Sequence, residues 1–103
     1  MKYNQNFKVL FNCDIDDDFI QFEIKSKGCL FGTTFKINKG NEYKVNFYDS
    51  TRFKQDIDDE LKIYKFFYPK NIIFIDEVTK EKILIAISEI VETKVYEKMV
   101  LHK

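Results

Sequence analysis

The first half of the chain alternates apolar and polar residues in short runs, a pattern typical of half-buried strands. Four such runs predict strands at residues 7–13, 19–26, 29–38 and 42–48. The segments between them are rich in Asp, Asn, Gly and Lys, and several of these residue types favour turns. Short turns between successive strands predict an antiparallel meander with one polar face.

Two glycines mark local features of this predicted sheet. Lys27 and Gly28 are expected to close a tight hairpin between the second and third strands. Gly32 lies inside the third strand, where a glycine indicates a bulge or a close approach of another backbone.

A helix is expected over about residues 51–61, directly after the fourth strand. Phe53, Ile57 and Leu61 recur every four residues and form one apolar stripe. The Asp-Ser-Thr sequence at 49–51 precedes this stripe, and each of these side chains can accept a hydrogen bond from a first-turn N–H group.

The second half of the chain is less regular. Residues 71–78 contain four consecutive apolar residues at 72–75, which favours a central strand buried on both faces. Residues 80–92 fit either a helix or a hairpin strand, and the helix is preferred because its apolar stripe continues through Ile90 and Val91. For segments 61–68 and 95–101, the pattern does not decide whether they form strands.

The fold class is therefore expected to be α+β, in a single domain over residues 1–103. An antiparallel meander of about five strands would form the sheet, and helices at about 51–61 and 80–92 would pack on one of its faces. The length of 103 residues and the 45% of hydrophobic residues support one folded domain rather than a disordered chain.

Charge and hydropathy exclude several classes of partner. Seventeen basic residues balance seventeen acidic ones, so the chain lacks the basic excess of most nucleic-acid-binding proteins. No apolar run approaches the roughly 18 residues of a membrane span, and the first residues lack the pattern of a signal peptide. A cytoplasmic protein is expected, with Cys13 and Cys29 as free thiols, although a disulfide between them stays open.

The sequence contains no recognisable catalytic or metal-binding motif. Residues 14–18 resemble the start of a calcium loop, but Phe19 replaces the required glycine and Lys25 the required glutamate. The sole histidine, His102, is next to the last residue, and no CxxC or HxxxH spacing occurs. No catalytic residue, metal or cofactor is expected, and the protein is predicted not to be an enzyme.

The acidic sequence in the predicted helix is the candidate contact surface for a protein partner. Clustered carboxylates steer a cationic partner and accept hydrogen bonds from its Lys and Arg side chains. The predicted contact residues are Asp49, Arg52, Asp56, Asp58, Asp59 and Glu60. Arg52 and Asp56 are also spaced to pair within the helix. An exposed aromatic residue near these carboxylates, Tyr48, Tyr64 or Phe67, would anchor the partner.

The run YKVNFYDSTRFKQDIDDE, followed after the proline by NIIFIDEVT, resembles small stand-alone immunity proteins of bacterial toxin–immunity systems. The resemblance covers roughly residues 43–90 and carries no catalytic or ligand residue. It implies a non-enzymatic inhibitor that binds a cationic toxin domain and occludes its site. The alternatives are a structural or accessory subunit that acts through homo-oligomerisation and a small-molecule-binding domain; the oligomeric state stays open.

Overall fold

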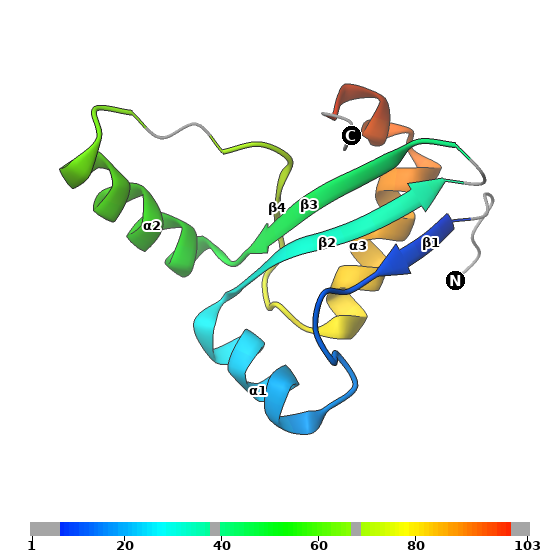
Figure 1. Cartoon of the computed structure of the whole chain (residues 1–103), viewed down its shortest axis with the longest axis horizontal. Helices are drawn as coiled ribbons and strands as arrows, with labels where there is room; N and C mark the ends of the chain where they lie inside the picture. Colours follow the sequence, from blue (N-terminus) through cyan, green and yellow to red (C-terminus); the bar gives the residue numbers. More distant parts are fainter. Residues whose placement is uncertain (1–6, 38–39, 67–68, 100–103) are drawn as a thin grey trace.

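The structure is a computed structural model and describes residues 7–37, 40–66 and 69–99. Eight elements follow one another along these residues (Figure 1). They are β1 (Phe7–Leu10), α1 (Asp18–Lys27), β2 (Cys29–Ile37), β3 (Glu42–Tyr48), α2 (Ser50–Ile63), β4 (Ile72–Phe74), α3 (Lys80–Glu92) and the 3-10 helix η1 (Val95–Lys98).

The strands form one four-stranded sheet in the order β1-β2-β3-β4. β1 and β3 each pair antiparallel with β2, whereas β4 pairs parallel with β3 and places Phe74 opposite Tyr48. The predicted α+β class is confirmed, but the antiparallel meander of about five strands is wrong. The chain crosses over through α2 before it adds β4, and a crossover returns a strand in the parallel direction.

Residues 19–26 form most of a helix, so the strand predicted there is wrong. The Asp17 carboxylate accepts hydrogen bonds from the backbone N–H groups of Phe19 at 2.8 Å and Ile20 at 3.1 Å. At the other end, Gly28 has a φ of 74° and donates its N–H to the Ile24 carbonyl at 2.9 Å. These two caps define α1. Gly28 therefore ends a helix and does not close the predicted hairpin.

The predicted strands at 29–38 and 42–48 are confirmed as β2 and β3, with residue 38 outside the described residues. The bulge at Gly32 is confirmed as well, because the register shifts between Leu30 and Thr33. Gly32 has a φ of 80° and donates its N–H to Asn46 Oδ1 at 2.9 Å. Its positive φ is a conformation that residues with a Cβ rarely adopt.

One face of the sheet carries the core. Phe35, Val45 and Phe47 alternate along β2 and β3 and are fully buried. They belong to one cluster with Ile83 and Ile87 of α3, which runs behind the sheet in Figure 1. Residues 80–92 are thus a helix, as preferred from their pattern.

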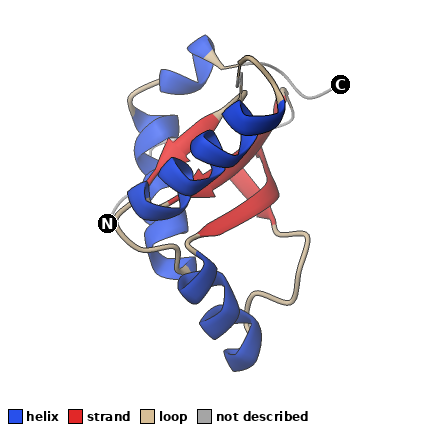
Figure 2. Ribbon diagram, turned by 90° about the vertical axis from the view of Figure 1, so that its left-hand side faces the viewer, coloured by secondary structure: helices blue, strands red, loops and turns tan. Residues whose placement is uncertain are grey.

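α2 confirms the helix predicted at about 51–61, but it does not pack on that face. None of its residues is buried, and it extends beyond the end of the sheet in Figure 1. Figure 2 shows the same arrangement after a turn of 90°, with the helices in blue and the strands in red. The prediction that the helices at about 51–61 and 80–92 both pack on one face of the sheet is therefore wrong.

Two further predictions concern the second half of the chain. The strand expected at the centre of the sheet is β4, an edge strand of three residues. Residues 61–63 belong to α2, and residues 95–98 form η1 rather than a strand. Residues 67–68 and 100–101 of the two undecided segments lie outside the described residues.

Candidate functional site

A cluster of four aromatic rings anchors the beginning of α2. Tyr48, the last residue of β3, is only 4% exposed, and its ring centroid lies 5.2 Å from that of Phe31 and 5.1 Å from that of Phe53. Phe53 also contacts Phe74 of β4, with 4.6 Å between centroids. All three pairs are edge-to-face, an arrangement that aromatic quadrupoles favour. The first turn of α2 is thereby joined to β2, β3 and β4.

A polar network surrounds these rings. Asp49 caps α2 by accepting the backbone N–H of Arg52 at 2.8 Å. The Asp56 carboxylate accepts two hydrogen bonds, one from Tyr48 Oη at 2.7 Å and one from Arg52 Nε at 2.9 Å. Arg52 Nη1 donates to the Lys27 carbonyl at 3.4 Å. The predicted pairing of Arg52 with Asp56 is confirmed. The hydrogen bond from Tyr48 to Asp56 links this pair to β3, and the hydrogen bond from Arg52 to the Lys27 carbonyl links it to the end of α1.

This network shifts two pKa values. Burial raises the pKa of the Tyr48 phenol, and its hydrogen bond to Asp56 raises it further. The hydrogen bond to Asp56 raises the pKa of Arg52. Both shifts favour the proton-donating forms, since a hydrogen bond to a carboxylate stabilises the protonated donor. Tyr48 and Arg52 therefore act as donors that fix the position of Asp56.

The six predicted contact residues fall into two groups. Asp49, Arg52 and Asp56 are part of the network at the base of α2. Asp58 and Asp59 are exposed and Glu60 is half-buried, and these three side chains form no ion pair within the described part of the chain. Because successive helical residues are rotated by about 100°, Asp58 faces away from Asp56 and Glu60.

The second half of α2 exposes large apolar side chains, among them Leu61 of the predicted apolar stripe. Ile63 is 73% exposed, and Leu61 and Tyr64 are exposed as well. The loop that follows adds Phe66, which is 72% exposed. Contiguous exposed apolar side chains mark interaction sites in soluble proteins. The signal for this patch was present in the sequence LKIYKF, which continues the apolar residues beyond the predicted stripe.

The predicted aromatic anchors have different outcomes. Tyr64 is exposed at the end of α2, as an anchor requires. Tyr48 is buried, so its prediction as an exposed anchor is wrong: its ring lies among Phe31 and Phe53, and its hydroxyl is bound to Asp56. Phe67 lies outside the described residues.

Other features of the described residues bear on chemistry. Cys13 and Cys29 are free thiols, as predicted. The acidic run at 14–18 supplies the α1 cap Asp17, and Asp16 forms an ion pair with Lys80. Within the described ranges, no group of three or more His, Cys, Asp and Glu side chains is arranged to hold a metal ion. The helices described there are all too short or too polar to cross a membrane.

Comparison of the chain with protein-family models, with curated proteins and with solved structures finds no match in any of the three. The resemblance to immunity-type proteins therefore stays a prediction.

Proposed function

We propose that this chain is a non-enzymatic protein-binding module and that α2 is its main contact element. The contact surface, called here the α2 surface, surrounds the second half of α2 and continues into the residues after it. It consists of Asp58, Asp59, Glu60, Leu61, Ile63, Tyr64 and Phe66. One observation carries the proposal: α2 is fourteen residues long, contains no buried residue and is held to the sheet mainly at its start.

The composition of the α2 surface indicates the chemistry of its partner. Exposed Leu, Ile, Tyr and Phe side chains gain free energy when they leave water, by roughly 25 cal/mol per Å² of apolar area. Carboxylates on the same helix turn attract lysine and arginine side chains. An apolar groove with a basic rim fits both features, in the manner of a helix bound in a groove.

The immunity-type inhibitor is the specific form of this proposal. The resemblance over residues 43–90 supports it, and this stretch includes α2 and the whole α2 surface. In this form the partner is a cationic toxin domain in the cytoplasm, and binding occludes its site. Inhibition by occlusion requires no catalytic group, cofactor or metal from the inhibitor.

The experiment is affinity capture from the native cell with three tagged proteins in parallel. They are the wild type, the double variant Leu61→Ser/Ile63→Ser and the control Phe22→Ser. Phe22 is 68% exposed on α1, so the control removes an equally exposed apolar side chain outside the α2 surface. We expect one stoichiometric toxin-like protein with the wild type and the control, and its loss with the double variant.

Two measurements complete the test. Circular dichroism and thermal melting must show that the double variant keeps the wild-type fold, and the purified partner must lose its toxic activity when wild-type protein is added. Retention of the partner by the double variant would contradict the role of α2. If the wild type is instead a stable homo-oligomer that the double variant converts into monomers, the α2 surface joins copies of this chain, and the structural-subunit alternative holds.

A further inference from the structure

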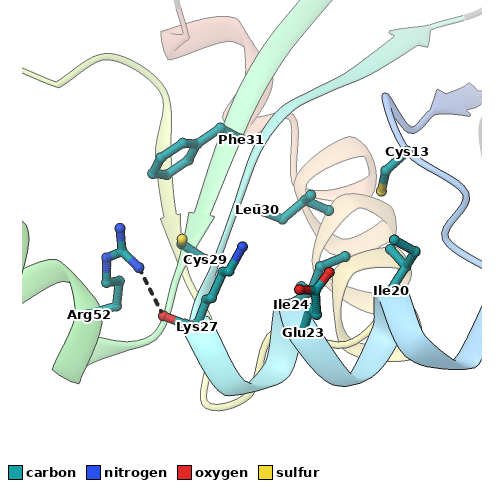
Figure 3. Close-up of a pocket in the computed structure, with 9 residues that line it drawn as sticks. All are labelled: Cys13, Ile20, Glu23, Ile24, Lys27, Cys29, Leu30, Phe31 and Arg52. Carbon is teal, nitrogen blue, oxygen red and sulfur yellow. Dashed lines mark hydrogen bonds between the residues drawn. The ribbon is translucent and has the colours of Figure 1, made fainter.

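A pocket of about 500 Å³ lies beside β2, between α1 and the beginning of α2 (Figure 3). It arises from the unequal lengths of the first two strands. β1 pairs with β2 only as far as Leu10 opposite Thr34, so none of the described strands lies beside residues 29–33 of β2 on that side. α1 and the segment around Cys13 border this part of β2 and leave a hollow between them.

The pocket is apolar along most of its length and cationic at one end. Its apolar lining consists of Ile20, Ile24, Leu30 and Phe31 together with the thiols Cys13 and Cys29. In Figure 3, Arg52 and Lys27 lie at the end near α2, whereas Ile20 and Cys13 lie at the opposite end. A volume of this size is in the range of about 300–1,000 Å³ that is usual for small-molecule sites.

The two cations retain donors that a ligand can use. Lys27 forms no ion pair among the described residues. Arg52 uses Nε for Asp56 and Nη1 for the Lys27 carbonyl, and a guanidinium has five N–H donors. Asp56 pairs with Arg52, and the Asp49 carboxylate lies against Gly28, next to Lys27 in the chain. Neither aspartate lines the pocket, so this end presents cationic N–H donors whose charge is offset by two nearby carboxylates.

The remaining charged residue limits where an anion can lie. Glu23 also lines the pocket, one helix turn before Lys27 on α1, and repels an anion in the middle of the pocket. The thiol of Cys29 lies at the Arg52 end: burial raises its pKa, the charges of Arg52 and Lys27 lower it, and those of Asp56 and Asp49 raise it. The Arg52 end is therefore the place where the pocket lining offers cationic hydrogen-bond donors to an anion.

We infer that this pocket binds an amphipathic carboxylate of medium chain length. The carboxylate accepts hydrogen bonds from Lys27 and Arg52, and the chain lies over Ile24 and Leu30 toward Ile20 and Cys13. This site is separate from the α2 surface, since the two share no residue. The inference therefore stands or fails independently of the proposed function.

The test uses the full chain with methyl groups of Ile and Leu labelled for NMR, and octanoate below its micellar concentration as the probe. We expect saturable shifts at Ile20, Ile24 and Leu30. Octanol, which has the same chain without the charge, is expected to bind about tenfold more weakly. Lys27→Met is expected to weaken octanoate by a similar factor, whereas Lys54→Met, an exposed lysine of α2 outside the pocket, leaves binding unchanged.

Thiol chemistry gives a second, position-specific readout. Bound octanoate is expected to slow the alkylation of Cys13 and Cys29 by iodoacetamide, as followed at each cysteine by mass spectrometry. Absence of methyl shifts with octanoate would overturn the site. Equal binding of octanol and octanoate, unaffected by Lys27→Met, would overturn the assigned ligand class. Neither result would alter capture of a protein partner by the α2 surface.

Discussion

The hydroxyl of Tyr48 donates a hydrogen bond to the Asp56 carboxylate at 2.7 Å, joining the last residue of β3 to the second turn of α2. The same carboxylate accepts Nε–H of Arg52 at 2.9 Å. One half-buried aspartate thus connects the sheet, the helix and the only arginine of the chain. This relationship explains how a helix without a buried residue holds a defined direction.

Tyr48→Phe tests the strength of this connection. The variant keeps the ring contacts with Phe31 and Phe53 but removes a hydrogen bond to a charged acceptor, which contributes about 1.5–3 kcal/mol. We expect the free energy of unfolding in urea to fall by about that amount. Tyr64→Phe is the matched control, because Tyr64 is exposed, and it should change the free energy of unfolding by less than about 0.5 kcal/mol. Equal effects of the two variants would contradict the assigned role.

The same contact predicts how stability depends on alkaline pH. Burial and the hydrogen bond to Asp56 raise the pKa of Tyr48 in the folded protein above the value of about 10 in the unfolded chain. The folded state therefore binds a proton more tightly than the unfolded state, and its stabilisation is complete below about pH 10. Above that pH the free energy of unfolding should decrease, and it should decrease less in Tyr48→Phe. Denaturation at a series of alkaline pH values measures how steeply the free energy of unfolding falls with pH in the wild type and in Tyr48→Phe.

Local sequence signals predicted β2, β3 and α3 because each buries one regular face. They failed at α1, where Ile20, Phe22 and Ile24 alternate like a strand. The helix buries Ile24, half-buries Ile20 one turn before it and leaves Phe22 exposed. Asp17 before this segment and Gly28 after it were the caps of a ten-residue helix, and these cap residues predict a helix better than the alternation predicts a strand.

The candidate site shows what a pattern of residues cannot reveal. Phe53, Ile57 and Leu61 form the apolar stripe of α2, but only tertiary structure determines whether a partner within the chain covers it. Phe53 is covered by Tyr48 and Phe74, while Leu61 is exposed. The carboxylates were found from their density in the sequence. Their division into anchoring and exposed residues depends on β3, which is not local to them.

Gly28→Ala tests the junction between α1 and α2. Gly28 has a φ of 74°, and a Cβ at this position would collide with the carboxylate of Asp49, the cap of α2. A residue other than glycine in the left-handed region costs about 1–3 kcal/mol, and displacement of the Asp49 cap adds about 1 kcal/mol. We expect a loss of roughly 2–4 kcal/mol in the free energy of unfolding.

Gly40→Ala is the control for this substitution. A Cβ at Gly40 would lie 3.4 Å from the Ile37 carbonyl oxygen, its nearest neighbour, and Gly40 is exposed. The expected change is within about 0.5 kcal/mol. If Gly28→Ala proves as mild as Gly40→Ala in thermal and urea denaturation, the packing of Gly28 against Asp49 is not a constraint on the fold.

Hydrogen exchange should separate α2 from the rest of the molecule. α3 contributes five buried residues to the structure, namely Ile83, Ile87, Ser88, Ile90 and Val91. α2 contributes none, so its local opening breaks few core contacts, and its amides should exchange about a hundredfold faster than those of α3 or more. Within α2, the turns held by Tyr48 and Asp56 should exchange more slowly than those near Ile63, and Tyr48→Phe should remove that difference. Exchange measured by NMR gives each rate. Equal protection of α2 and α3 would mean that α2 is covered in solution, by a second copy or another part of the chain, and that the α2 surface is not available to a partner.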